Sequence, residues 1–332
     1  MSIAVKNNIK RFKRLARKGF GRSGLMNRSM KDALSIFLYH EVSDSPSRFC
    51  EQYNLNITPK LFAKQMDFIT NHFNMISPDQ LLEGNYDTPA ALITFDDGMP
   101  GYFREAVPIM ARKGISSVIF LNMAPLEGDI FWSGLITYLT ECDTQFRNVL
   151  DNHFPRQKNV PGFLLCNNKI VNDYIATIDF SSLEIKVRSF YGLFANLKDL
   201  DSVRDNPLVF FGNHLHNHYN AIQLSDEELR QQYLLNDQKI LKYSNGRSLF
   251  AYPFGQPGIC FTMRQTELLR FFGAKAVFSS SGCINRRDQN GFYDRIGIDF
   301  SIETVDDLFG LIKWMRIKTT FLNIRNLSRK IR

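Results

Sequence analysis

Two adjacent carboxylates at the end of an apolar segment are the first residues of this chain that could do chemistry. Asp96 and Asp97 follow residues 90–95, which have the composition of a buried strand, and Gly98 comes next. Neighbouring side chains at a strand end point in different directions, so one carboxylate can bind a metal ion while the other acts as a base. The same residues also fit an ordinary turn, in which Gly98 supplies a positive φ.

Three of the six histidines fall within five positions, directly after the apolar residues 208–211. In a helical turn His214 and His218 would share one face and could bind one cation, whereas His216 would point elsewhere. Two neutral imidazoles and one carboxylate leave coordination positions open for water and substrate, as in catalytic metal sites. A single histidine is usually a packed or solvated residue, but three in five positions favour a metal site.

A third segment, residues 250–255, ends another expected strand. Its Tyr252-Pro253-Phe254-Gly255 turn could form a pocket wall or present a backbone N–H to an oxyanion. By itself this segment also fits an ordinary strand exit.

Short apolar and amphipathic segments alternate through most of the chain, which predicts parallel βα units. Residues 130–207 lose this alternation, and we expect a helical insertion there, with helices at 131–139 and 181–197. Ligands bind at the carboxyl ends of parallel strands, so the three segments are expected to meet at one end of the sheet. The expected strands are 33–39, 90–95, 116–121, 208–211, 249–252 and 276–278, and the expected helices are 60–71, 79–82, 101–113, 225–241 and 262–272.

The composition is that of a folded protein. Of 332 residues, 44% are hydrophobic and 22% are charged, which excludes disordered, collagenous and coiled-coil chains. The length suits two ordinary domains or one large α/β barrel with insertions. The five cysteines are odd in number and form no C-x-x-C pair, so we expect free thiols rather than a disulfide framework.

The net charge of +8 is distributed unevenly. Residues 1–31 contain ten basic residues and no acid, and residues 308–332 contain seven and no acid. The body, residues 32–307, holds 24 basic and all 33 acidic residues, so its net charge is −9. Nucleic-acid binding is disfavoured, because the acidic body would repel phosphates and neither end matches a known nucleic-acid-binding motif.

The two basic ends are expected to be separate segments from the body. Apolar residues recur at helical spacing within residues 1–31, which predicts a basic amphipathic segment, and residues 308–332 predict a basic helix or tail. Two interpretations stay open: binding to an anionic membrane surface, or a solvated tail with a final helix packed on the core. No apolar run reaches the ~20 residues of a membrane span, and none resembles a signal peptide. We therefore expect a cytoplasmic protein, and binding to an anionic membrane would place it peripherally at the inner membrane face.

Four motifs, in this order, resemble the polysaccharide deacetylase family, also called NodB homology or carbohydrate esterase family four. The first is similar to the Tyr-His-x-Val signature of the subgroup that includes poly-N-acetylglucosamine deacetylases. The resemblance covers most of residues 33–300 and implies a distorted (β/α) barrel with a helical insertion. The motifs are Tyr39-His40-Glu41-Val42, Thr94-Phe95-Asp96-Asp97-Gly98, the His214-x-x-x-His218 pair followed by Leu224-Ser-Asp-Glu-Glu-Leu229, and Phe250-Ala-Tyr-Pro-Phe-Gly255.

The resemblance implies a role for each matching residue. Asp96 would be the general base, and Asp97, His214 and His218 would hold a divalent metal, usually zinc, although cobalt, nickel, manganese or iron also serve. The chain has no histidine after His218, so the general acid implied by the subgroup is His40. Its ordinary pKa suits proton donation near neutrality, although a histidine at a strand end also fits a purely structural role.

Two positions depart from the family pattern. Ala251 stands where an arginine is usual, and Arg295 is the candidate for a compensating charge; Leu215 stands where serine or threonine is usual. Tyr252, Phe254 and Arg295 are candidates for contact with the substrate or its oxyanion.

The resemblance therefore implies a metal-dependent hydrolase that removes an N-acetyl group from a sugar. We expect the substrate to be an intermediate of surface-polysaccharide synthesis, either a lipid-linked glycan or a nucleotide sugar, and the basic ends favour the former. One alternative is removal of another acyl group, such as formyl or O-acetyl. Another is a glycan-binding protein without activity on the same fold, which the missing arginine at position 251 mildly favours.

Overall fold

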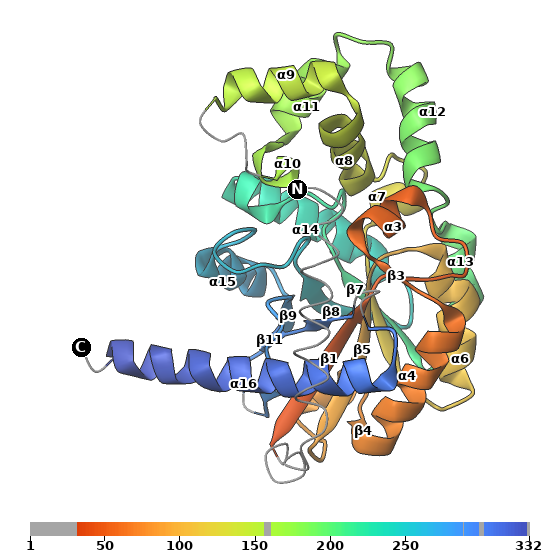
Figure 1. Cartoon of the computed structure of the whole chain (residues 1–332), viewed down its shortest axis with the longest axis vertical. Helices are drawn as coiled ribbons and strands as arrows, with labels where there is room; N and C mark the ends of the chain where they lie inside the picture. Colours follow the sequence, from red (N-terminus) through yellow and green to blue (C-terminus); the bar gives the residue numbers. More distant parts are fainter. Residues whose placement is uncertain (1–31, 156–160, 288, 299–301, 331–332) are drawn as a thin grey trace.

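The core of the computed structural model is a parallel sheet that curls into a barrel (Figure 1). The structure describes residues 32–155, 161–287, 289–298 and 302–330, so the expected amphipathic segment at 1–31 lies outside the described residues. Each expected strand is present within a few residues of its expected bounds. The sheet runs in the order β1 (Ala33–Tyr39), β5 (Ala90–Asp97), β6 (Ser117–Leu121), β7 (Val209–Asn213), β8 (Gly246–Ala251) and β9 (Ala276–Ser279).

One short segment joins the two edges of this sheet. Strand β11 (Phe292–Asp294) pairs in parallel with β9, and β12 (Ile296–Gly297) pairs in parallel with β1. Only Arg295 separates the two strands, so it lies where the barrel closes. The result is a nearly closed, distorted (β/α) barrel, which confirms the predicted fold class.

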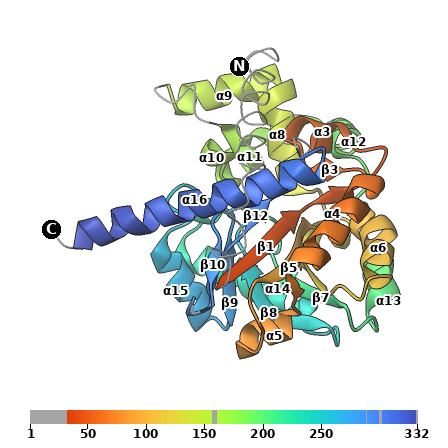
Figure 2. The same cartoon turned by 60° about the horizontal axis from the view of Figure 1, so that its bottom comes forward.

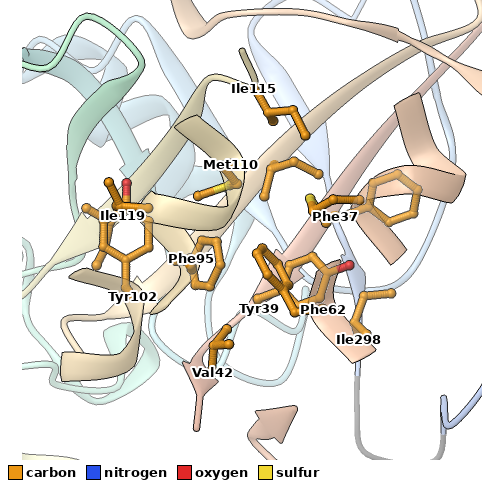
Figure 3. Close-up of a cluster of buried hydrophobic side chains, with 14 of the residues drawn as sticks. Phe37, Tyr39, Val42, Phe62, Phe95, Tyr102, Met110, Ile115, Ile119 and Ile298 are labelled. Atoms are coloured by element: carbon orange, nitrogen blue, oxygen red, sulfur yellow. The ribbon is translucent and has the colours of Figure 1, made fainter. Parts of the chain in front are cut away.

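The strands present alternate side chains to two apolar layers, as the period of a β-strand requires. Phe37, Tyr39 and Phe95 face outward (Figure 3), and Tyr39 and Phe95 pack against Phe62 of helix α4 (Pro59–His72). Tyr39 meets the Phe62 ring edge-on at 5.2 Å between centroids. The inward-facing residues fill the barrel: Leu34, Ile36, Leu92, Val118, Phe120, Phe210, Leu249, Ala251 and Phe278.

The outer helices occupy the expected places. Helix α4 begins after Thr58, whose side chain accepts a hydrogen bond from the N–H of Leu61. The single helix expected at 101–113 is instead a π-helix, η1 (Tyr102–Ala106), followed by α6 (Val107–Ala111). The remaining barrel elements include β2 (Glu41–Val42), α3 (Arg48–Tyr53), β3 (Asn56–Ile57), β4 (Asn74–Met75), α5 (Pro78–Glu83), α7 (Met123–Leu126), η2 (Ala221–Gln223), α14 (Asp226–Ile240), α15 (Met263–Phe271) and β10 (Asn285–Arg286).

The predicted insertion between β6 and β7 is helical and lies at one end of the barrel (Figure 1). It has an apolar core of its own, to which Phe49 of α3 also contributes. The helix expected at 181–197 ends earlier, at Tyr191, because Gly192 takes a positive φ and α13 (Leu197–Val203) packs on the barrel instead. The insertion helices are α8 (Trp132–Cys142), α9 (Thr144–His153), α10 (Gly162–Leu165), α11 (Asn168–Ile175) and α12 (Phe180–Tyr191).

The last helix, α16 (Val305–Lys330), crosses the barrel and then projects beyond it, as Figures 1 and 2 both show. Leu308, Leu311 and Ile312 bury its first half against the barrel. Within the described ranges, no helix combines the length and hydrophobicity that crossing a bilayer requires. The five cysteines are all unpaired, as predicted.

Candidate active site

A cavity of about 530 Å³ opens where β1, β5 and β7 end, beside the helical insertion. His40, Asp96, Asp97, His214 and His218 all line it. These residues come from three motifs that are distant in sequence. The parallel register of β1, β5, β6 and β7 brings them together, because it sets the carboxyl ends of the strands at one end of the barrel.

Asp97, His214 and His218 form a buried cluster in which one ligand atom from each lies within 4.8 Å of the others. Oδ1 of Asp97 is 3.0 Å from Nε2 of His218 and 3.5 Å from Nε2 of His214. Nδ1 of His214 donates a hydrogen bond to the carbonyl of Ala251 at 2.8 Å. This bond sets the tautomer that leaves Nε2 free to bind a cation, as in many metal-ligating histidines. The donor set therefore fits a divalent metal.

The two histidines meet Asp97 through an irregular loop, not through the predicted helical turn. Leu215 and His218 each have a φ of 61°, and Asp97 has a φ of 76°. In a regular strand the side chain of Asp97 would point away from the barrel interior, opposite to that of Asp96. The left-handed backbone conformation at Asp97 instead directs its side chain toward the two histidines. His216, as predicted, is not part of the cluster.

Buried asparagines hold this loop in place, and the sequence analysis missed them. The amide of Asn122, just after β6, donates to the carbonyls of His214 and Leu215, the second at 2.8 Å. The side-chain oxygen of Asn213 accepts a hydrogen bond from the N–H of Leu215 at 3.0 Å. It accepts a second one from the side-chain amide of Asn236, on α14, at 2.8 Å. Because asparagine is common in turns and caps, nothing in its sequence position distinguishes it as a support for the loop.

Asp96 is held by Arg295. Nη1 and Nη2 of the guanidinium donate to Oδ1 and Oδ2 of Asp96 at 2.6 and 2.8 Å, and the guanidinium carbon lies 5.2 Å from the centre of the Phe120 ring. Burial acts to raise the pKa of Asp96, but the charges of Arg295, His214 and His40 and the hydrogen bonds from Arg295 outweigh it, so the pKa lies below its ordinary value. Asp96 is therefore ionised at neutral pH.

This pairing supplies the charge expected in place of the arginine missing at position 251. Arg295 is 0% exposed, however, and its Nε–H donates a hydrogen bond to the carbonyl of Ser279 at 3.2 Å. The predicted contact of Arg295 with a substrate does not fit this arrangement, because the guanidinium lies behind Asp96 and away from the solvent.

His40 follows β1 directly, on the same face of the strand as the inward-facing Leu38, and its side chain reaches the cavity. Burial lowers the pKa of His40, while the carboxylates of Asp97 and Asp96 act to raise it. The imidazolium is therefore a stronger acid than an exposed histidine, and the two carboxylates lie close enough to favour its charged form.

Tyr252 and Phe254 both line the cavity, as predicted, but in different ways. The hydroxyl of Tyr252 is hydrogen-bonded to the Thr266 hydroxyl at 3.1 Å, and its ring stacks on Phe261 at 3.7 Å, so its polar end is already engaged. Phe254 has a φ of 60°, and its ring lies edge-on to His218 at 5.0 Å. Phe254 thus forms one wall beside the metal ligands.

No family model matches this sequence, and no curated protein matches it significantly. The structure is similar to a de-N-acetylase from Aggregatibacter actinomycetemcomitans, with a TM-score of 0.56 and 15% identity over 84% of this chain and 100% of the other. It is also similar to the deacetylase PplD of Streptococcus pyogenes, with a TM-score of 0.53 and 16% identity over 80% and 92% of the two chains. For BC0361, a polysaccharide deacetylase from Bacillus cereus, the values are 0.53 and 12% over 84% and 69%.

These likenesses extend over most of this chain, at low sequence identity. The chain therefore has the polysaccharide deacetylase fold that its four motifs predicted.

Proposed function

We propose that this protein is a metal-dependent hydrolase that removes the N-acetyl group from a sugar. The observation that carries the proposal is the convergence of Asp96, Asp97, His214, His218 and His40 on one cavity. A carboxylate kept ionised, a three-residue cation site and a histidine beside them are the groups that amide hydrolysis requires. The solved structures of similar fold include a de-N-acetylase, which supports the same activity.

Each residue has a defined task in this reaction. A divalent cation held by Asp97, His214 and His218, most simply zinc, would supply Lewis-acid polarisation of the acetyl carbonyl. Asp96 accepts a proton from the water whose oxygen bonds to the carbonyl carbon. His40 donates a proton to the sugar nitrogen as the C–N bond breaks, because an unprotonated amide nitrogen is a poor leaving group. The products are acetate and the free amino sugar.

The Asp96–Arg295 pair also bears on the alternative of a glycan-binding protein without activity. The mild support for that alternative was the alanine at position 251. Since Arg295 places a guanidinium against the proposed base Asp96, the alanine at position 251 no longer favours a loss of activity.

The test is release of amine from N-acetylated sugars by the purified full chain, with zinc or cobalt added. We expect the Asp96→Asn variant to lose at least about 100-fold in kcat, the usual contribution of a general base. His218→Asn should lose metal binding, and His216→Asn, a change in the same loop outside the cluster, should retain it. Equal activity of Asp96→Asn and the parent would refute the assigned base, and release of formate or of acetate from an ester alone would replace the acyl group proposed.

We further propose that the substrate is a lipid-linked intermediate of surface-polysaccharide synthesis, met at the inner membrane face. The support is the charge distribution, with ten basic residues in 1–31 and seven in 308–332 around an acidic body. Helix α16 carries part of this charge outward from the barrel, and its Trp314 is 45% exposed. Each basic residue near anionic headgroups contributes about 1 kcal/mol to binding.

Co-sedimentation with vesicles of phosphatidylglycerol and phosphatidylcholine tests this location. The full chain should bind and residues 32–332 should bind more weakly, and raising the salt concentration should weaken both. Unchanged binding after removal of residues 1–31 would contradict a role for the N-terminal segment in membrane association.

A further inference from the structure

The cavity continues past the catalytic residues and runs along the helical insertion. Its outer part is lined by α3 and α8, two helices that no catalytic motif includes. A volume of about 530 Å³ is within the range of pockets that enclose a ligand larger than an acetyl group. The reaction centre uses one end of this space, so the other end is available to bind another part of the substrate.

Helix α8 turns a polar face to this space. Ser133, Thr137, Thr140 and Glu141 line the cavity, and their spacing places them along one side of the helix. The opposite side is apolar, and its Leu135, Ile136 and Leu139 pack into the core of the insertion. Ser133 and Thr137 are buried. The Thr140 hydroxyl donates to the carbonyl of Ile136 at 2.8 Å, which leaves its oxygen able to accept a hydrogen bond from a ligand in the cavity.

Helix α3 supplies the facing side. Gln52 and Tyr53 line the same cavity as Thr137 and Glu141 of α8. Tyr53 is 41% exposed, and its ring packs at 5.4 Å from the Phe49 ring, which belongs to the insertion core. A fixed, accessible aromatic ring offers an apolar surface to the C–H face of a pyranose, and the neighbouring amide, hydroxyl and carboxylate groups suit sugar hydroxyls.

The charges in the cavity favour a neutral or amino sugar over a nucleotide. Asp96, Asp97 and Glu141 line it, and among the described residues that line it there is no lysine or arginine. The two phosphates of a nucleotide sugar would therefore lack lysine or arginine partners among the described lining residues, and Glu141 would repel them. A chain of N-acetylated sugars carries no such charge.

We infer that α3 and α8 form a sugar subsite beside the reaction centre, so that the substrate is an N-acetylated oligosaccharide of at least two units. Tyr53 would stack on the neighbouring unit, and Gln52, Thr140 and Glu141 would hydrogen-bond its hydroxyls. This inference rests on the proposed deacetylase function for the unit at Asp96 but assigns new residues to specificity. It also selects the glycan over the nucleotide sugar.

The test compares three probes with the zinc-loaded full chain: N-acetylglucosamine, its tetramer and UDP-N-acetylglucosamine. We expect kcat/KM for the tetramer to exceed that of both single-sugar probes by at least 10-fold. Tyr53→Ala and Glu141→Ala should each reduce the ratio of tetramer to monosaccharide by about 10-fold, mainly through KM. Glu51→Gln, an exposed acid on α3 outside the cavity lining, is the matched control and should leave the ratio unchanged.

A binding measurement separates this inference from the proposed function. Tetramer affinity is measured by calorimetry with the Asp96→Asn variant, with and without Tyr53→Ala. If no probe is deacetylated but Tyr53→Ala still weakens tetramer binding, the subsite stands and the proposed activity fails. Preference for UDP-N-acetylglucosamine, or tetramer affinity that is unaffected by both Tyr53→Ala and Glu141→Ala, would overturn the subsite whether or not the protein is a deacetylase.

Discussion

Arg295 donates one hydrogen bond to each carboxylate oxygen of Asp96, although the two residues are 199 positions apart in the chain. The segment that carries Arg295 is also the one that joins the two edges of the barrel. The same segment therefore closes the barrel and positions the proposed base. A change at Arg295 should affect both stability and catalysis.

We expect Arg295→Lys to lower kcat by about 10-fold or more and to move the acid side of the pH–rate profile to higher pH. Lysine cannot make both hydrogen bonds, so the charge that lowers the pKa of Asp96 is less well placed. Arg295→Met should cost about 3–5 kcal/mol of stability because it leaves a buried carboxylate unpaired. The measurements are pH–rate profiles and denaturant unfolding.

The Arg247–Asp79 pair offers a matched control for this prediction. Nε and Nη2 of Arg247 bond the two oxygens of Asp79 at 2.7 and 2.9 Å, but both side chains are partly exposed. Arg247→Met should therefore cost at most about 1 kcal/mol and leave kcat unchanged. Equal losses of stability in the two variants would contradict the argument from burial.

Asn236→Ala should weaken zinc binding by about 10- to 100-fold, because Asn236 supports Asn213, which holds the loop of the two histidines. Asn245 is also buried, and its amide bonds the carbonyls of Val203 and Val209 away from that loop. Asn245→Ala should reduce stability without changing zinc affinity. Competition with a chromophoric chelator measures both affinities, and equal zinc affinity in the two variants would show that the asparagines do not position the ligands.

Glu41 makes stability fall as pH rises. Burial raises the pKa of Glu41 from 4.5 to about 7. Hydrogen bonds from the N–H groups of Val42 and Gly101 and the charge of Arg104 act in the opposite direction but are outweighed. The folded state therefore binds more protons than the unfolded state between pH 4.5 and about 7, and its stability falls by at most about 1.4 kcal/mol per pH unit in that window. Urea unfolding at several pH values should show a smaller fall for Glu41→Gln. The same slope in both proteins would exclude Glu41 as the cause.

Gly212→Ala should destabilise the barrel by about 1–3 kcal/mol and lower activity as well. A Cβ at this position would lie 2.6 Å from the Phe120 ring, and that ring packs beneath the guanidinium of Arg295. Gly297 also lies in a barrel strand, but a Cβ there would meet no atom within 4 Å. Thermal unfolding and kcat of Gly297→Ala should stay close to those of the parent, and a similar loss in both variants would exclude the clash as the cause.

The sequence by itself determined most of the barrel and the identity of the clustered residues. Strands such as 33–39 and helices such as 60–71 are encoded locally, by apolar periodicity, N-caps and turn residues, and the structure confirms them within a few residues. The motifs likewise marked Asp97, His214 and His218, because parallel strands bring their carboxyl ends together whatever the details of the loops.

Only the tertiary structure decided how those residues are held. The loop of His214 and His218 is irregular rather than helical because Asn122 and Asn213 bond its backbone groups, and Asn236 of a third element supports Asn213. The bond of Arg295 to Asp96 depends on closure of the barrel, and the presence of α3 and α8 along one cavity depends on packing within the insertion. These are long-range contacts, and their partners carry no local pattern that periodicity or spacing can reveal.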